Sequence, residues 1–240
     1  MLKIYHSQGA RSLRVVWLCE EMGVPYETAE ASFFKPSDEF KAANPLRTVP
    51  AMQDGDVTMI ESVAMMIYIM SKYGPTDLEV KPNEPGYADY LQYLMFGEAG
   101  LAAYGNPLVA TRYMAPEGEK QNFTTNYLKS AILKRLDFVG ERLAGRPYLA
   151  AGRFTAADIS IAYIASAAKF AGIDIAFRGP VYAAAGNVKV IGGVPEQCLV
   201  AADSGTCLIE GYLMGRVAAR QDCIVQENIA GTAVVREGDI

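Results

Sequence analysis

The stretch NPLRTVPAM, residues 44–52, decides how the first part of the chain folds. The chain turns at Asn44-Pro45, continues as far as Val49, and then places Pro50 at the start of an expected strand. Proline has no N–H for a sheet ladder, so it belongs at a strand's first residue, at a sheet edge or at a bulge. A proline fixed at such a position, in the cis form, shapes the backbone for a specific purpose.

Alternating strand and helix patterns surround this stretch. The predicted order is β-α-β-α-β-β-α. A strand at 2–6 is followed by a helix at 11–23, which Gly23 and Pro25 stop, and by a second strand at 26–31 that is parallel to the first. A helix at 38–43 capped by Ser37 comes next, then a hairpin that turns at Asp54-Gly55-Asp56, and finally a helix capped by Ser62. Val63, Met66, Ile67 and Met70 share one face of that last helix.

The rest of the chain divides into three parts. Residues 79–86 belong to a proline-rich stretch without periodicity, which predicts a linker. Residues 87–177 are dominated by long helical periodicities, with Thr155 as an N-cap and Asp158 as its partner in a near capping box. Residues 178–240 lose this period and form an atypical tail of uncertain structure, in which NVKVIGG and CLVAA look strand-like. No internal repeat is visible. The domains predicted are therefore 1–78, 79–86, 87–177 and 178–240.

Composition and charge exclude several classes of function. The net charge of −5 provides no basic field for nucleic acid or an anionic membrane, so neither is expected as a partner. The start lacks the long apolar core of a signal peptide, and the four cysteines have no close metal-binding spacing. We therefore expect a cytoplasmic protein without a metal site. The single histidine, His6, also argues against catalysis by histidine acid/base chemistry.

Together, four pieces resemble the cytosolic glutathione transferases of the bacterial kind. They are QGARSLRVVWLCEEMGVPYE, NPLRTVPAM, ESVAMMIYI and RPYLAAGRFTAADISIAY, which lie in this order between residues 8 and 163. The resemblance implies an N-terminal thioredoxin-like domain followed by an all-helical domain, with glutathione as the co-substrate. It also implies a homodimer.

The resemblance assigns a glutathione-binding role to two segments. Pro50 would be the family's cis-proline, and Val49 would pair its backbone N–H and C=O with the cysteinyl part of glutathione. Ser62, at a helix N-terminus, would bind the γ-glutamyl carboxylate. Glu61 would face the ammonium group. A proline that merely starts a strand and a serine that merely caps a helix are the alternatives.

Three further residues near these segments complete the implied site. Lys35 lies where the family often has a basic residue for the glycyl carboxylate, and Arg47 is a second candidate for that task. Thr48 stands where relatives often carry a longer glutamine or lysine.

The catalytic group must favour the thiolate of glutathione over its thiol. An ordinary thiol titrates at about 8.5, and lowering that pKa by about two units takes on the order of 3 kcal/mol. A hydroxyl donor and the N-terminal end of the first helix can supply this stabilisation. Ser12 matches the second serine of the family's serine motif, so we expect Ser12 as the donor and Arg11 as an electrostatic helper, with Ser7 as an alternative. A Ser12 that only caps the helix is the other interpretation. The usual serine positions hold Gly9 or Ala10.

The expected function is transfer of glutathione to a small electrophile, and the alternative is a glutathione-binding or stress protein that retains the fold without the chemistry. Phe96, Tyr104 and Tyr113 are possible walls of the second substrate's site, but they fit a helical core as well. The tail is either an unusual extension or the result of a frame change near Phe177, which sequencing of the gene across codons 170 to 180 distinguishes.

Overall fold

The computed structural model describes residues 1–7, 9–32 and 35–170, together with short strands between residues 180 and 235. The chain forms two compact units. The first comprises Met1–Arg135, Leu149–Ala151 and Thr155–Ile173, and the second comprises Leu136–Tyr148, Gly152–Phe154 and Asp174–Ile240. Among the described residues, no helix has both the length and the hydrophobicity that a membrane crossing requires.

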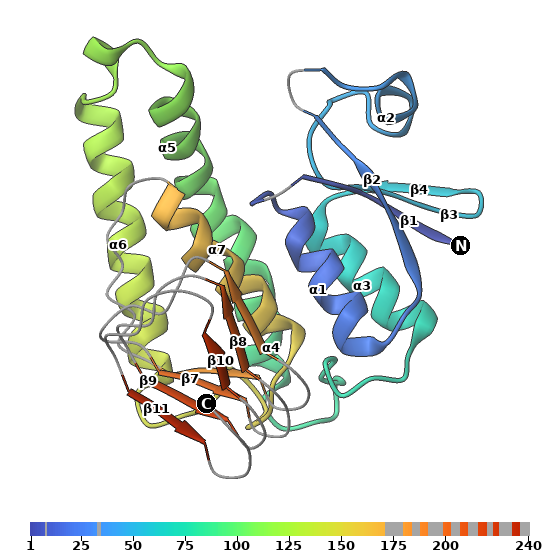
Figure 1. Cartoon of the computed structure of the whole chain (residues 1–240), viewed down its shortest axis with the longest axis vertical. Helices are drawn as coiled ribbons and strands as arrows, with labels where there is room; N and C mark the ends of the chain where they lie inside the picture. The colour runs from blue at the N-terminus through green and yellow to red at the C-terminus, as the bar shows by residue number, and fades with distance from the viewer. Residues whose placement is uncertain are drawn as a thin grey trace. The chain divides into compact units, whose positions relative to one another are not determined.

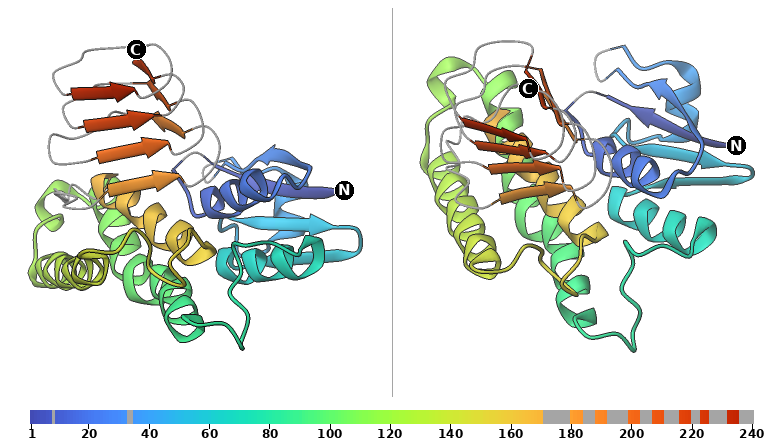
Figure 2. Two further views of the ribbon diagram at one scale, coloured as in Figure 1. Left: turned by 90° about the horizontal axis from the view of Figure 1, so that it is seen from below. Right: turned by 60° about the horizontal axis from the view of Figure 1, so that its bottom comes forward.

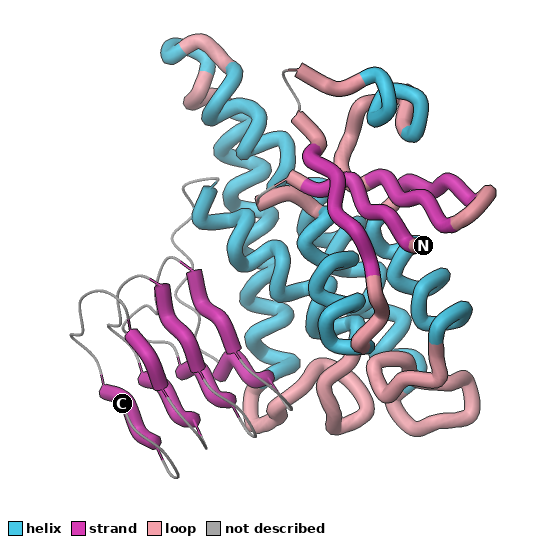
Figure 3. Tube along the Cα trace, turned by 45° about the vertical axis from the view of Figure 1, so that its right-hand side comes forward, coloured by secondary structure: helices cyan, strands magenta, loops and turns pink. Residues whose placement is uncertain are grey.

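The first unit begins with the predicted β-α-β-α-β-β-α order. Its elements are β1 (Leu2–His6), α1 (Ser12–Met22), β2 (Tyr26–Glu30), α2 (Asp38–Ala43), β3 (Ala51–Asp54), β4 (Val57–Ile60) and α3 (Ser62–Tyr73). The strand order is β2-β1-β3-β4, in which β2 is parallel to β1 and the other pairings are antiparallel. Helices α1 and α3 cover one face of this sheet and α2 covers the other (Figures 1 and 3). The predicted thioredoxin-like fold is thus confirmed.

The predicted ends of these helices are set by local chemistry. Gly23 adopts φ 64° after α1, and its N–H reaches the carbonyls of Cys19 and Glu20. The Ser37 hydroxyl accepts a hydrogen bond from the N–H of Phe40 at 3.1 Å and caps α2, as predicted.

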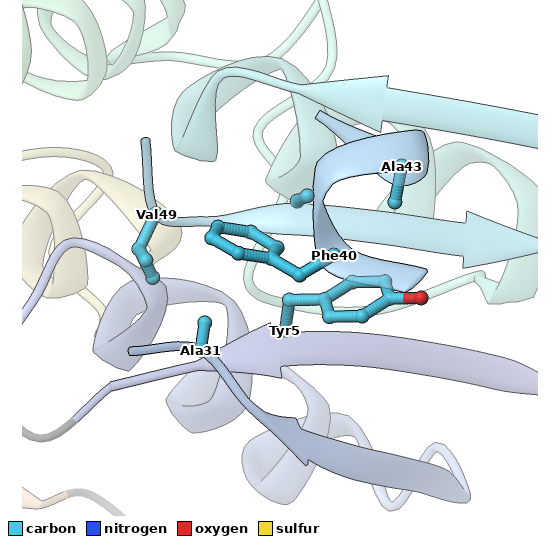
Figure 4. Packing of buried hydrophobic residues seen from close by; sticks show 6 residues of the cluster. Tyr5, Ala31, Phe40, Ala43 and Val49 are labelled. Atoms are coloured by element: carbon cyan, nitrogen blue, oxygen red, sulfur yellow. The ribbon is translucent and has the colours of Figure 1, made fainter. Parts of the chain in front are cut away.

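A compact apolar cluster lies between the sheet and α2. It consists of Tyr5, Ala31, Phe40, Ala43, Val49 and Ala51, all of them buried (Figure 4). The rings of Tyr5 and Phe40 lie with their centroids 5.5 Å apart. Side chains alternate along a strand, so Tyr5 faces α2 while its neighbour Ile4 faces the opposite side. The cluster therefore fixes α2, and with it the segment that leads to Pro50.

The helical part of the first unit confirms the prediction of an all-helical region after the first fold. It contains α4 (Tyr87–Met95), the π-helix η1 (Phe96–Ala102), α5 (Ala103–Met114), the short η2 (Glu117–Glu119), most of α6 (Phe123–Leu143) and α7 (Ala156–Phe170). The capping box before α7 is present, because the N–H and the hydroxyl of Thr155 both donate to Asp158, at 2.8 and 3.0 Å. The exact domain boundaries stay a prediction.

Close packing joins η1 to α7. A Cβ atom added at Gly97 would lie 2.2 Å from the Ser160 hydroxyl oxygen and 2.4 Å from the Ser160 carbonyl oxygen. Only glycine permits this approach, and it brings the backbone of η1 directly against α7.

The described strands of the second unit are all paired in parallel. One sheet has the order β11-β9-β7-β5 and the other has β10-β8-β6. Their bounds are Pro180–Ala183 (β5), Val188–Ile191 (β6), Leu199–Ala202 (β7), Cys207–Glu210 (β8), Arg216–Ala219 (β9), Cys223–Val225 (β10) and Thr232–Val235 (β11). Figure 2 shows the four-stranded sheet as a stack of arrows. The strands predicted in NVKVIGG and CLVAA are confirmed, whereas the regular alternation of successive strands between two sheets was not predicted.

Candidate functional site

Three strand ends lie side by side at one end of the first sheet. Tyr5 of β1 pairs with Ala51 of β3, and Ala51 pairs with Ile60 of β4. The segments that follow β1, precede β3 and follow β4 therefore leave the sheet from neighbouring positions. Pro50 and Glu61 are the first residues beyond this row, and the β1–α1 turn begins beside them. The sequence-predicted residues around Pro50, Glu61 and the β1–α1 turn are brought together in this way.

The segment before β3 is held in a defined conformation. The peptide bond between Val49 and Pro50 is cis, as predicted. The buried Asn44 donates from Nδ2 to the carbonyl oxygen of Thr48 at 2.6 Å and to its hydroxyl at 3.0 Å. The Val49 side chain is buried in the apolar cluster, whereas Thr48 is exposed. The fold thus anchors this segment through side chains, and Asn44 performs a task that sequence reasoning did not assign to it.

The segment after β4 contains an unusual backbone conformation. Glu61 has φ 75° and ψ 102°, which a side-chain-bearing residue adopts at a cost on the order of 1–3 kcal/mol. Glu61 is exposed and occupies the N-cap of α3, and its carbonyl accepts the first helical hydrogen bond from Met65 at 2.9 Å. The prediction that Ser62 caps this helix is wrong. The N-cap is Glu61, one residue earlier than predicted, and Ser62 is the first helical residue. The side chain of Glu61 makes no capping hydrogen bond.

The Ser62 hydroxyl instead contacts a fully buried arginine, Arg14 of α1, which sequence reasoning missed. The partners of Arg14 are the hydroxyl of Ser62 (3.1 Å), the carbonyl of Gly97 (2.8 Å), the carboxylate of Glu98 (2.5 Å) and the carbonyl of Ser160 (3.2 Å). Its guanidinium carbon also lies 4.6 Å from the centre of the Tyr163 ring. Burial lowers the pKa of Arg14, and the Glu98 carboxylate opposes this effect. Arg14 thus ties α1 and α3 to η1 and α7.

Two candidate catalytic residues differ in their exposure. Arg11 is the N-cap residue of α1, and its side chain, 29% exposed, donates from Nη1 to Glu98 Oε1 at 2.7 Å. Ser12 is fully buried: its hydroxyl oxygen lies 2.9 Å from His6 Nδ1 and accepts a hydrogen bond from the N–H of Ser7 at 3.3 Å. Burial lowers the pKa of His6, which favours the neutral imidazole. The Ser12 hydroxyl is therefore engaged within the turn, while Arg11 presents surface to a ligand.

Lys35, the first candidate for the glycyl carboxylate, is not brought to this group by any described contact. Lys35 is exposed, and its backbone N–H donates to the Ser32 hydroxyl at 3.0 Å. Phe33 and Phe34 before it lie outside the described residues. Within the described part of the chain, no group of three or more histidine, cysteine, aspartate or glutamate residues is arranged to hold a metal ion.

Comparisons with known proteins agree on one family. Residues 5–77 match the family described as "Glutathione S-transferase, N-terminal domain". Glutathione S-transferase 3 of Schizosaccharomyces pombe is 30% identical over 173 residues, which cover 66% of this chain and 70% of that protein.

Solved structures show the same likeness. The structure of the glutathione transferase URE2P8 from Phanerochaete chrysosporium with oxidized glutathione aligns with a TM-score of 0.63 and 25% identity, covering 70% of this chain and 79% of that one. URE2P6 from the same organism, in complex with oxidized glutathione, aligns with a TM-score of 0.63 and 28% identity, covering 71% and 80%. The predicted bacterial subdivision stays a prediction.

Proposed function

Because the chain belongs to the glutathione S-transferase family and is a glutathione transferase, we propose that it transfers glutathione to small, hydrophobic electrophiles. The observation that supports this most directly is the row of Tyr5, Ala51 and Ile60, since it gathers three loop segments at one sheet end. Glutathione would lie against these segments as an extended peptide.

The binding groups proposed for glutathione follow from this arrangement. The backbone of Val49, held in place beside Pro50, would pair with the cysteinyl residue. Ser62 would receive the γ-glutamyl carboxylate at the N-terminal end of α3, where helix N–H groups favour an anion. Glu61, exposed at the same end, would face the ammonium group. Thr48 and Lys35 would contact the remainder of the peptide from its outer side.

The geometry of Ser62 suits a carboxylate ligand. Its hydroxyl oxygen accepts a hydrogen bond from Arg14, which leaves the hydroxyl hydrogen to be donated elsewhere. A serine oriented in this way acts as a donor, which is the role that an anionic ligand requires.

Thiolate formation would take place at the N-terminal end of α1. Arg11 is the cation with exposed surface there, and we assign it the larger share of thiolate stabilisation. Ser12 would contribute by holding the turn through His6 and Ser7, and its hydroxyl would reach the sulfur only after it leaves these partners. Lowering the thiol pKa by about two units takes on the order of 3 kcal/mol, which a charge-assisted hydrogen bond and the helix dipole can provide together.

A titration of the thiolate absorbance of glutathione bound to the purified protein tests this assignment. The bound thiol should titrate below the free thiol, and Arg11→Gln should raise its pKa more than Ser12→Ala does. An aryl halide is the first electrophile to assay. Binding with an unshifted thiol pKa would contradict the proposed chemistry.

The second candidate function is glutathione binding without transfer. The contacts of the Ser12 hydroxyl favour this alternative, because His6 and Ser7 engage it within the turn. Tight binding of glutathione with no change of its thiol pKa, and no turnover of any aryl halide, would support the alternative over the enzyme.

We also propose that the protein works as a cytoplasmic homodimer in detoxification. Exposed apolar side chains on α3 and α4, namely Ile67 (39% exposed), Leu91 (38%) and Met95 (46%), offer surface for a second copy. Sedimentation equilibrium on the full chain measures the dimer, and Met95→Glu should weaken it.

A further inference from the structure

The carboxylate of Glu98 is divided between two arginines with different surroundings. Its Oε1 accepts a hydrogen bond from Arg11 Nη1 at 2.7 Å, and its Oε2 accepts one from Arg14 Nη1 at 2.5 Å. The side chain of Arg14 is fully buried, that of Arg11 is 29% exposed and that of Glu98 is 24% exposed. Glu98 thus links an interior cation to a cation at the surface.

The interior side of this pair is fixed. Arg14 also donates to the carbonyls of Gly97 and Ser160, and its guanidinium packs against the Tyr163 ring. A guanidinium with partners on all its nitrogens and a ring on its face has one orientation. The Glu98 oxygen that it binds is therefore fixed as well, and so is the direction in which the other oxygen points.

The backbone beneath Glu98 is equally constrained. Glu98 lies in the π-helix η1, directly after Gly97, whose position admits no Cβ because Ser160 lies too close. Single-turn π-helices often occur at functional sites. Here the π-helix places the carboxylate where α1 begins, 87 residues away in the sequence from Arg11.

We propose that Glu98 is a positioning residue that holds the Arg11 guanidinium at the N-terminus of α1, ready to stabilise a thiolate. This inference rests on the proposed function. Arg11 uses Nη1 for Glu98, and a guanidinium has further N–H donors for a ligand. A donor fixed before the ligand binds stabilises a developing charge without the cost of reorganisation.

The charges of this cluster are compatible with the role. Two guanidinium groups and one carboxylate leave a net positive charge beside the thiolate position. Glu98 by itself would disfavour a thiolate, so its benefit must come from the placement of Arg11. Replacement by aspartate keeps the charge and shortens the side chain by one methylene, which isolates placement from charge.

The experiment compares Glu98→Asp, Arg11→Gln and the double variant by the thiol pKa of bound glutathione and by kcat/KM. We expect Glu98→Asp to raise the thiol pKa by about one unit and to lower kcat/KM roughly tenfold. The two changes represent the same free energy, because one pKa unit and a tenfold change in rate each equal about 1.36 kcal/mol. The double variant should show the same thiol pKa and the same kcat/KM as Arg11→Gln, because Glu98 acts on the thiolate only through Arg11. Glu117→Asp, whose side chain is 89% exposed and pairs with Lys120, is the matched control and should change neither quantity.

A structural role alone would lower the thermal midpoint and leave the bound thiol unchanged, and that result overturns the inference. A Glu98→Asp protein that binds glutathione with an unchanged or lower thiol pKa, while Arg11→Gln raises it, overturns the inference and leaves the proposed function standing. A normal thiol pKa in the unaltered protein overturns both. Should Glu98→Asp fail to fold, Arg11→Lys keeps the interior pair intact. It should raise the pKa partway, since an ammonium group lacks the guanidinium fork, and an unchanged pKa there would also contradict the inference.

Discussion

Arg14 donates from Nη1 to the hydroxyl of Ser62 at 3.1 Å and thereby joins the first turn of α1 to the first residue of α3. Both residues are almost completely buried. The bond has two consequences, one for stability and one for ligand binding, and each can be measured separately.

Loss of Arg14 should destabilise the protein. Arg14→Met removes a buried cation, together with the hydrogen bonds that it donates to the carbonyls of Gly97 and Ser160. Breaking a buried pair from one side typically costs about 3–5 kcal/mol. Urea denaturation measures the free energy of unfolding, and the exposed Arg112→Met is the control, for which we expect a change below about 0.5 kcal/mol. Equal stability of the two variants would contradict the structural role given to Arg14.

Loss of the Ser62 hydroxyl should weaken glutathione binding. Ser62→Ala removes the proposed donor to the carboxylate, and the loss of a hydrogen bond to a charged group costs about 1.5–3 kcal/mol, or roughly 10- to 150-fold in Kd. Isothermal titration with glutathione measures this. Ser71→Ala, an exposed serine near the end of the same helix, should bind as the unaltered protein does. If both variants bind equally well, Ser62 does not contact the ligand.

Phe40 should be the main support of the segment around Val49. Its ring is fully buried in the apolar cluster, and replacing a buried phenylalanine by alanine costs about 3–5 kcal/mol. Phe40→Ala should therefore lower the free energy of unfolding by that amount and weaken glutathione binding as well, since Val49 packs in the same cluster. Phe123→Ala, at a side chain that is 85% exposed, should have little effect on either.

Stability should depend on pH through Asp158. Burial raises the pKa of Asp158 from 3.8 to about 6, although hydrogen bonds from Leu149 and Thr155 favour the carboxylate. The folded state therefore binds this proton more tightly than the unfolded state does. The contribution is fully present below pH 3.8 and is lost as the pH rises through about 6.

Asp158→Asn should abolish that part of the pH dependence. For this group alone, the free energy of unfolding falls by up to about 3 kcal/mol across the window. Thermal unfolding between pH 4 and 7 measures the slope, with the exposed Asp137→Asn as the control. An identical slope in Asp158→Asn and the unaltered protein would assign the pH dependence to other groups.

Local chemistry in the sequence was sufficient for most of the first fold. The turn at Asp54-Gly55-Asp56, the stop at Gly23 and the cap at Ser37 each act within a few residues, and each is present as predicted. The strand that begins directly after Pro50 also follows from the local sequence, whereas the cis bond before Pro50 was implied by the family resemblance. The prediction failed by one residue at Ser62, because the positive φ of Glu61 has no signal in the residue type.

The network around Glu98 could not be predicted in the same way. Arg14 stands among Leu13, Val15 and Val16, and a charged residue on a helix that buries so many neighbours is a signal for a buried ion pair. Its partner was not predictable, since Glu98 lies 84 residues further along and reaches Arg14 only through the π-helix. Likewise, strands in the tail are visible locally, whereas their parallel pairing depends on contacts between distant segments.

The row formed by Tyr5, Ala51 and Ile60 determines how this protein tolerates insertions and deletions. Main-chain pairing sets the spacing of the loops that leave that end of the sheet, so a single residue gained or lost inside β3 would shift every side chain of that strand to the other face. The opposite end of the hairpin, at Gly55 and Asp56, is exposed and can change length with no effect on that spacing. Natural variation in loop length should therefore concentrate at the hairpin tip, and engineered tags inserted there should leave glutathione binding intact.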